Sequence, residues 1–379
     1  MILSSNKKIW LSSPHLSDNE RKYVNEAFDS NWIAPVGPHI NSFEEKISKI
    51  SNDSHVAVLN SGTAAIHLAL ILLDVRIGDN VLCSSFTFAA STNPIVYLGA
   101  KPVFIDSEKD TWNMCPILLE NAIIELSLKD EKPKAIILVH LYGYPAKMNE
   151  ILAISKKYSI PLIEDAAEAI GSSYNGIPLG TFGDLGVFSF NGNKIITTSS
   201  GGALLSSNKK FIDKAKFLST QARDEYPHYE HSEIGYNYRM SNICAAIGLG
   251  QIEVLKERVD KRRYIFDFYK EKLSDIKEIK FVDDLPGFYS NRWLTTILFK
   301  KDAAINRESM RLHLLKDNIE SRPLWKPMHL QPVFKKYQVF ENGISEDLFD
   351  RGLCLPSGSN MNEEDLMRVI RQIKMVYEK

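Results

Sequence analysis

Short apolar runs alternate with helical segments through the first half of the chain. Six of these runs have the length of a strand: residues 55–60, 81–85, 102–105, 135–141, 161–163 and 186–190. Several are separated by helical segments, such as the apolar helix expected over 64–73. Continuous apolar runs between helices are typical of strands buried on both faces of a parallel sheet. The pattern predicts an α/β fold, with a large, mostly parallel sheet sandwiched by helices.

The pattern changes beyond Ser241, where it predicts one long helix that ends near Leu273. The apolar face of this helix consists of Ile252, Leu255, Val259, Phe266 and Tyr269. A mixed α+β region follows, and the final helix has apolar residues at i, i+3, i+4 and i+7, namely Leu366, Val369, Ile370 and Ile373. We predict a large domain over 1–250 and a smaller α+β domain over 251–379, begun by the long linking helix.

The N-terminal region carries two local signals. Ser17 to Glu20 has the form of a capping box, in which Ser17 accepts from first-turn amides and Glu20 reaches back. It predicts a helix with Val24, Ala27 and Phe28 on one face. The stretch from Asn31 to Pro38 is rich in proline and apolar residues but has no period. Such a loop is costly to expose, so we expect it to pack against, or to cover, another part of the protein.

Composition and charge exclude several classes of protein. The 379 residues carry 46 basic and 47 acidic side chains, and this balance favours neither nucleic acid nor an acidic membrane surface. No apolar run approaches the ~18 residues that span a bilayer, and residues 1–10 contain no apolar signal segment. The four cysteines form no C-x-x-C pair, and the nine histidines show no metal-ligand spacing. We expect a cytoplasmic globular protein without a metal site.

Lys194 stands at the centre of the stretch 186–202. The apolar run before it stops at Asn191-Gly192-Asn193, residues suited to a tight turn. Because its neighbours Phe190 and Ile195 are apolar, we expect the lysine to be partly desolvated. Desolvation favours the neutral amine, which can attack a carbonyl and form a Schiff base. The alternative is an ordinary exposed loop lysine.

Two further features follow other strands of the predicted sheet. Ser61-Gly62-Thr63 joins a strand to a helix N-terminus, where free amides and the helix dipole favour an anion. An ordinary capped turn is the alternative. Asp165 comes directly after an apolar run, where burial of a carboxylate is costly without a cationic partner. A helix N-cap is the alternative role for Asp165.

These parts together fit one pocket, that of pyridoxal phosphate. The turn Ser61-Gly62-Thr63 and Ser189 would hold the phosphate, and Phe88 would stack on the pyridine ring. Asp165 would keep the ring nitrogen protonated, so that the ring can accept electrons from a carbanion. Lys194 would form the Schiff base.

The sequence resembles the sugar-nucleotide aminotransferases of the DegT/DnrJ/EryC/StrS family, which have the fold-type I aminotransferase architecture. The resemblance covers nearly the whole chain and is carried by Asn31 to Pro38, Ser61 to Ala65, Glu164 to Glu168, Ser189 to Lys194, Gly235 to Met240 and the segment around His329. It implies that Lys194 binds the cofactor and moves the proton, that Asp165 pairs with the pyridine nitrogen and that Phe88 is the stacking ring. It also implies that Glu168 lies beside the cofactor, at a position where the family often has glutamine or histidine.

The resemblance further implies a homodimer with shared active sites. Asn237 and Arg239 would approach the phosphate side of the cofactor from the neighbouring subunit. The substrate-binding positions that it implies are Ile33, Ala34, Arg239 and His329.

A branch of this family with the same Asn-Trp-Ile-Ala-Pro loop and Pro-Met-His-Leu-Gln-Pro segment acts on UDP-4-keto-6-deoxy-N-acetylhexosamine. The resemblance to this branch implies transfer of the amino group of L-glutamate, which leaves as 2-oxoglutarate, to C4 of the sugar. Two alternatives stay open. One is a pyridoxal phosphate-dependent sugar dehydratase, although in those enzymes the lysine is typically a histidine. The other is a cofactor-binding regulatory or structural protein without turnover.

Overall fold

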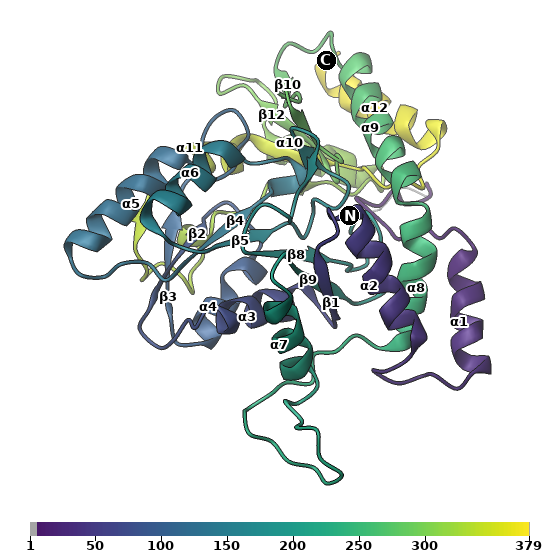
Figure 1. The fold of residues 1–379 in the computed structure, drawn as a ribbon. Helices are drawn as coiled ribbons and strands as arrows, with labels where there is room; N and C mark the ends of the chain where they lie inside the picture. Colours follow the sequence, from purple (N-terminus) through teal and green to yellow (C-terminus); the bar gives the residue numbers. More distant parts are fainter. Residues whose placement is uncertain (1–5, 379) are drawn as a thin grey trace.

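A large eight-stranded sheet forms the centre of the computed structural model, which describes residues 6–378 (Figure 1). Its strands, in spatial order, are β1 (His55–Leu59), β9 (Gly202–Ser206), β8 (Leu185–Ser189), β5 (Leu162–Asp165), β4 (Ala135–Val139), β2 (Asn80–Ser84), β3 (Lys101–Ile105) and β14 (Val339–Phe340). Every pairing is parallel except the two made by β9. All six predicted strands are present, and the predicted α/β fold class is confirmed.

Helices cover both faces of this sheet, as the apolar runs require. One face packs against α2 (Pro38–Ile50), α5 (Pro116–Leu128), α6 (Met148–Tyr158) and α8 (Asn242–Glu253). The other packs against α3 (Gly62–Leu72), α4 (Asn93–Tyr97) and α7 (Lys209–Ser219). Side chains alternate along each strand, so that in β2 Leu82 joins the first core while Val81 and Cys83 join the second. Burial on both faces explains why the strands are continuous apolar runs.

A second sheet, of four antiparallel strands, lies in the C-terminal part of the chain. Its order is β10 (Ile279–Phe281), β12 (Thr295–Phe299), β15 (Gly352–Leu355) and β13 (Arg322–Pro323). The helices α9 (Leu255–Lys272), α10 (Arg307–Lys316) and α12 (Glu363–Tyr377) contribute to a separate core with it. All four apolar residues predicted to face inward on the final helix are buried in this core.

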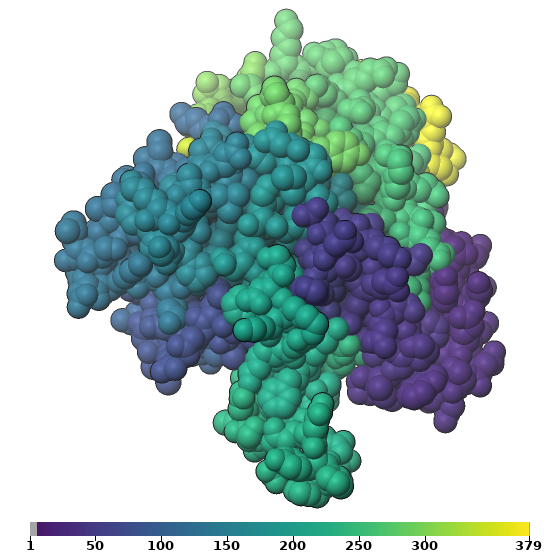
Figure 2. All heavy atoms as spheres, in the orientation of Figure 1, coloured from purple at the N-terminus to yellow at the C-terminus, as the bar shows by residue number. Residues whose placement is uncertain are grey.

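The remaining elements are short. A three-stranded sheet joins β11 (Phe288–Tyr289), β6 (Ser173–Tyr174) and β7 (Ile177–Pro178), and two further helices are α1 (Asn19–Asp29) and α11 (Ile344–Arg351). Three single turns of 3-10 helix are η1 (Ala89–Ser91), η2 (Leu141–Gly143) and η3 (Met328–Leu330). Between α7 and α8, residues 223–234 project from the body of the protein (Figures 1 and 2).

The predicted long helix is wrong as a single element, because it breaks at Val254 into α8 and α9. Val254 has φ −107° and ψ 9°, which are not helical values. Apolar residues before and just after the break, such as Ile252 and Leu255, join the large core, whereas Ile265 and Tyr269 join the small one. The broken helix thus contributes side chains to both cores.

The predicted domain division, 1–250 and 251–379, stays a prediction. Two observations bear on it. Ile9 packs in the small core, where it forms a parallel bridge with Ile319, and β14 adds a late segment to the edge of the large sheet. The chain thus passes between the large sheet and the small core more than once.

The predicted capping box is only half correct. Glu20 does reach back, since its two carboxylate oxygens accept from the Ser17 N–H at 3.1 and 3.0 Å. The N-cap position, however, is Asp18, which has φ 73° and makes no side-chain cap. Of the predicted apolar face, Ala27 is buried but Phe28 is 60% exposed. The helix packs on α8 through its Glu20 and Ala27 side, which turns Phe28 outward.

The structure also bears on the predictions about membrane-spanning segments and cysteines. Within 6–378, no helix is long and apolar enough to cross a membrane. All four cysteines are free thiols. Residues 1–5 of the N-terminal stretch lie outside the part that the structure describes.

Candidate active site

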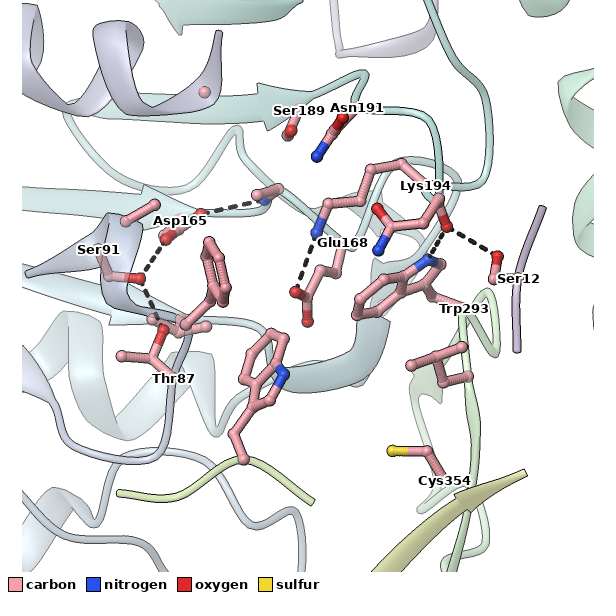
Figure 3. Close-up of a pocket in the computed structure, with 18 of the residues that line it drawn as sticks. Ser12, Thr87, Ser91, Asp165, Glu168, Ser189, Asn191, Lys194, Trp293 and Cys354 are labelled. Atoms are coloured by element: carbon pink, nitrogen blue, oxygen red, sulfur yellow. Dashed lines mark hydrogen bonds and ion pairs between the residues drawn. The ribbon is translucent and has the colours of Figure 1, made fainter. Parts of the chain in front are cut away.

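A cavity of about 820 Å³ opens at the carboxyl ends of the parallel strands. Its walls combine the ends of β2, β5 and β8 with segments from the C-terminal part of the chain (Figure 3). Ligands in open α/β sheets bind at this edge. The cavity falls in the size range of small-molecule sites, roughly 300–1,000 Å³.

Lys194 lies in this cavity on a turn that is held from two sides. The turn closes through the Lys194 N–H, which donates to the Asn191 carbonyl at 3.0 Å. The carbonyl of Asn193, the residue directly before Lys194, accepts from the Ser12 hydroxyl at 2.8 Å and from the Trp293 indole N–H at 2.7 Å. The Lys194 side chain is 12% exposed, and its Nζ lies 4.1 Å from the Trp293 ring centroid. The lysine is therefore a partly buried cavity residue, not a solvated loop residue.

The Nζ of Lys194 points at Glu168 (Figure 3). It donates to Oε1 of that carboxylate at 3.0 Å, and Oε2 accepts from the Tyr142 main-chain N–H at 2.8 Å. Glu168 is only 4% exposed. Burial raises the pKa of Glu168 to about 7, although the positive charge of Lys194 opposes the shift. The carboxyl therefore sits at the boundary between its two protonation states near neutral pH.

Asp165 ends strand β5 on the other side of the cavity. It is 5% exposed, and its oxygens accept from the Ser91 hydroxyl at 2.6 Å and the Ala167 N–H at 3.2 Å. Burial raises the pKa of Asp165 above its ordinary value. Among the described residues no cation pairs with it, and no α-helix begins there. The helix-cap alternative is thus not met, and the carboxylate is free to accept from a protonated ligand nitrogen.

Three segments meet closely at the N-terminus of α3. Ser61 is the N-cap of this helix, and its hydroxyl accepts from the Ala64 N–H at 3.1 Å. A Cβ added at Gly62 would lie 3.1 Å from the Ser189 Cβ, and one added at Gly202 would lie 2.4 Å from the Gly62 nitrogen. The glycines therefore allow two backbones and Ser189 to converge on the helix end. The capped turn is confirmed, and the role of this helix N-terminus as an anion site stays a prediction.

An aromatic wall completes the cavity. Phe88 is 58% exposed and its ring centroid lies 5.8 Å from that of Trp325, which in turn lies 5.0 Å from Tyr142 and 6.2 Å from Trp293. The sequence analysis missed Trp293 and Trp325, which line the cavity, and Tyr142, which packs against both tryptophans. Tyr142 follows strand β4, and that position could have identified it. Trp293 has no local signal.

Pyridoxal phosphate fits these residues. A buried carboxylate without a cation at Asp165 suits a protonated pyridine nitrogen, and the α3 turn with Ser189 suits a phosphate. Phe88 presents an exposed ring in the cavity lining, and Lys194 offers an amine. The phosphate of the cofactor is negative and its protonated ring nitrogen is positive. Their predicted partners, a helix N-terminus and the Asp165 carboxylate, have the opposite charges.

Five predicted site residues do not line the cavity of their own chain: Ile33, Ala34, Asn237, Arg239 and His329. Ile33 is 54% exposed, and the Ala34 carbonyl accepts from the Asn242 N–H at 2.9 Å. Their assignment to the site stays a prediction.

The other three are engaged elsewhere in the chain. Arg239 pairs with Glu44 at 2.6 Å, with its side chain only 11% exposed. The Asn237 carbonyl accepts from the Asn60 side chain at 3.2 Å, and His329 Nδ1 lies 2.6 Å from the Ser85 hydroxyl. For Asn237 and Arg239 the prediction places them at the site of a neighbouring subunit.

The architecture and the fit of the cofactor place the chain among the pyridoxal phosphate-dependent aminotransferases of fold type I. More narrowly, the chain belongs to the DegT/DnrJ/EryC1/StrS aminotransferase family, whose model matches residues 14–374. The family, the enzyme class and the cofactor predicted from the sequence are thereby confirmed.

Individual relatives match along their full length. EpsN of Bacillus subtilis (strain 168), a predicted pyridoxal phosphate-dependent aminotransferase, is 53% identical over 368 residues, which are 96% of this chain and 94% of that protein. GDP-perosamine synthase of Escherichia coli O157:H7 is 38% identical over 372 residues, 98% of this chain and 99% of that protein. The crystal structure of a DegT/DnrJ/EryC1/StrS aminotransferase from Brucella abortus is similar with a TM-score of 0.89 and 29% identity, over 96% of both chains.

Proposed function

We propose that this protein transfers the amino group of L-glutamate to C4 of a nucleotide-linked 4-keto-6-deoxy sugar, for bacterial surface glycan synthesis. The first candidate is UDP-2-acetamido-2,6-dideoxy-4-keto-hexose. The observation that carries the proposal is the position of the Lys194 amine, held inside a cavity at the carboxyl edge of the sheet. The cavity is open enough to admit a substrate beside the cofactor.

Pyridoxal phosphate, when bound, supplies the electron sink that makes amino transfer possible. The chain supplies position and proton transfer. Ser61, Gly62, Thr63 and Ser189 would hold the phosphate, and Asp165 would keep the ring nitrogen protonated. Lys194 Nζ accepts and returns the proton that moves during each half of the reaction. The aromatic wall excludes water from the face where the substrate lies.

Positive charge at the cavity suits the anionic groups of both substrates. Arg322 and Lys326 line the cavity, and the Arg322 side chain is 67% exposed, although Glu320 partly neutralises it at 2.8 Å. A guanidinium can bind a carboxylate or a diphosphate with two hydrogen bonds. We assign these cations to the carboxylates of L-glutamate and the diphosphate of the nucleotide, which occupy the site in turn.

A GDP-linked sugar is the second candidate, favoured by the 38% identity to a GDP-perosamine synthase. The UDP-linked candidate rests on the Asn31 to Pro38 loop and the segment around His329. Product analysis with UDP-, GDP- and dTDP-linked 4-keto-6-deoxy sugars tests both, and it should include the configuration at C4. Failure to aminate any of them would overturn the proposal.

A spectroscopic measurement separates the enzyme from its rivals. The yellow absorbance of the purified protein should bleach when L-glutamate is added, because only a transaminase takes up the amino group in the absence of the sugar. A regulatory protein without turnover would keep its colour. A sugar dehydratase would consume the keto sugar without producing an amine.

We also assign the active unit to a homodimer with shared sites. The projection 223–234 leaves Tyr229 78% exposed and Ile234 87% exposed, and large apolar groups are rarely left in water on a projecting segment. Asn237 stands at its base, bridged to Thr220. A second copy of the chain, packed on this projection, would bury these side chains and bring Asn237 and Arg239 towards its cofactor.

A further inference from the structure

Lys194 and Glu168 form a buried ion pair inside the cavity. Their side chains are 12% and 4% exposed, and 3.0 Å separates Nζ from Oε1. Glu168 has one other hydrogen-bond donor, the Tyr142 N–H at 2.8 Å on Oε2. Tyr142 has φ 52°, so a left-handed backbone residue aims this N–H at the carboxylate. The carboxylate is thus fixed at one oxygen and faces the lysine with the other.

The partner of Glu168 is the group that must lose its charge during the reaction. If the proposed function is correct, on which this inference rests, Lys194 has to become a neutral amine to act. An ionised Glu168 would then be buried without a cation, which is strongly unfavourable. A proton moved from Nζ to Oε1 avoids this, because the pair keeps a net charge of zero in both forms.

Other groups around Glu168 favour its neutral form. The Asp165 carboxylate is a like charge and raises the pKa of Glu168, while the Tyr142 phenol and the Cys354 thiol lie near it in their neutral forms. Burial raises the pKa values of both Tyr142 and Cys354. Lys194 is the cation among the described groups that act on Glu168 at close range.

We infer that Glu168 is the proton acceptor of Lys194. The N–H bond of the ammonium breaks, an O–H bond forms at Oε1, and the neutral amine is delivered facing the cavity. The reverse transfer restores the ammonium once the lysine no longer has to accept a proton. A glutamine at this position can hold the lysine in place but cannot take the proton.

Infrared titration of the full-length protein without cofactor tests this directly. As the pH falls, the C=O stretch of a protonated carboxyl should appear with a midpoint near the raised pKa of Glu168, about 7. It should be absent from Glu168→Gln, which also separates it from the band of Asp165. In Lys194→Met the midpoint should rise by roughly 1–3 pH units, because an adjacent opposite charge has been removed.

A matched control is Glu20→Gln, which alters a buried glutamate outside the cavity. Glu20 is 4% exposed, and hydrogen bonds from Gln251 and Ser17 lower its pKa although burial opposes them. Its replacement should leave the band near pH 7 unchanged. An equal midpoint in wild type and Lys194→Met would overturn the proposal, as would a band that persists in Glu168→Gln.

A second readout uses the enzyme loaded with cofactor. The pH profile of the half-reaction with L-glutamate should contain a limb near pH 7 that Glu168→Gln abolishes, while the maximal rate falls less than the ~100-fold expected for loss of a direct base. Retention of that limb in the variant would contradict the role. Absence of any half-reaction, with the infrared result intact, would instead refute the proposed function.

Discussion

Glu164 and Glu168 are two buried glutamates on one segment, and their surroundings differ. Glu164 is fully buried and both of its oxygens are saturated. They accept from His140 Nε2 at 2.9 Å and from the N–H groups of Gly180, Phe182 and Gly183 at 2.9, 2.5 and 2.7 Å. Among the described residues, the Glu168 carboxylate accepts hydrogen bonds from one main-chain N–H and from one lysine.

The difference separates a structural carboxylate from one available for chemistry. Glu164 ties the loop before β8 to the sheet, and nothing around it needs to move or lose charge. Glu168 faces a cavity and is paired with a side chain that can change its charge. Burial alone therefore does not identify an active-site acid. The number and kind of the hydrogen-bond donors around the carboxylate distinguish the two cases.

The largest expected effect comes from the partner of Glu168. Lys194→Ala should lower the transamination rate by more than roughly 10⁴-fold, because it removes both the covalent link and the proton carrier. Pyridoxal phosphate should still bind through the phosphate and ring contacts, which equilibrium dialysis can measure. Near-wild-type transamination by the variant would show that Lys194 is not the catalytic lysine.

Asp165→Asn should rank next. The amide fits the same space but cannot keep the ring nitrogen protonated, so we expect about 10²-fold slower turnover, comparable to the removal of one electrostatic contact to a transition state. The free energy of unfolding, from urea titration, should change much less in proportion. A variant with wild-type activity would return Asp165 to a structural role like that of Glu164.

Glu164→Gln should destabilise the fold by about 3 kcal/mol, a cost typical of breaking a buried, saturated charged group. One of its oxygens becomes an NH₂ that faces main-chain N–H donors, so hydrogen bonds to the Gly180 to Gly183 loop are lost. Chemical denaturation measures this cost. Unfolding free energy equal to that of Glu168→Gln would remove the contrast between the two carboxylates.

Glu168→Gln should change the pH dependence of stability in a defined direction. The folded-state pKa of Glu168 is about 7, against an ordinary value of 4.5, so between these values the folded state binds more protons than the unfolded one. As pH rises through this window, wild type loses stability on the order of 3 kcal/mol from this group, and the variant does not. Denaturation at about pH 4.5 and about pH 8 should show the difference. A constant offset between the two proteins would refute it.

Subunit mixing decides whether Asn237 is structural, like Glu164, or acts on a site, like Glu168. We expect Lys194→Ala and Asn237→Asp homodimers to be inactive, the second because a carboxylate would repel the cofactor phosphate. With shared sites, one site of each mixed dimer carries both lesions and the other carries none. Random mixing should then restore roughly a quarter of all sites. No recovery, despite demonstrated exchange of subunits, would contradict a shared site.

The sequence by itself determined the sheet and the polar positions along its carboxyl edge. Continuous apolar runs specify strands buried on both faces, and their alternation with helices specifies a mostly parallel sheet. Because parallel strands end at one edge, Ser61, Asp165 and Lys194 had to come together there although they are far apart in the chain. Local pattern was sufficient for these residues, since each one lies at the end of its own strand or on the turn that follows it.

The tertiary structure alone decided how the cavity is closed and which charges pair. Trp293 reaches the lysine turn across 100 positions of sequence, through its indole and the Asn193 carbonyl. The break at Val254 and the outward turn of Phe28 both depend on packing against distant elements, which periodicity within one helix does not encode. The pairing of Glu168 with Lys194 likewise joins two separate segments of the chain, and Trp293 from the C-terminal part of the chain lies beside the lysine. Burial set by long-range contacts determines the charge state of such groups, and a single sequence carries no local record of it.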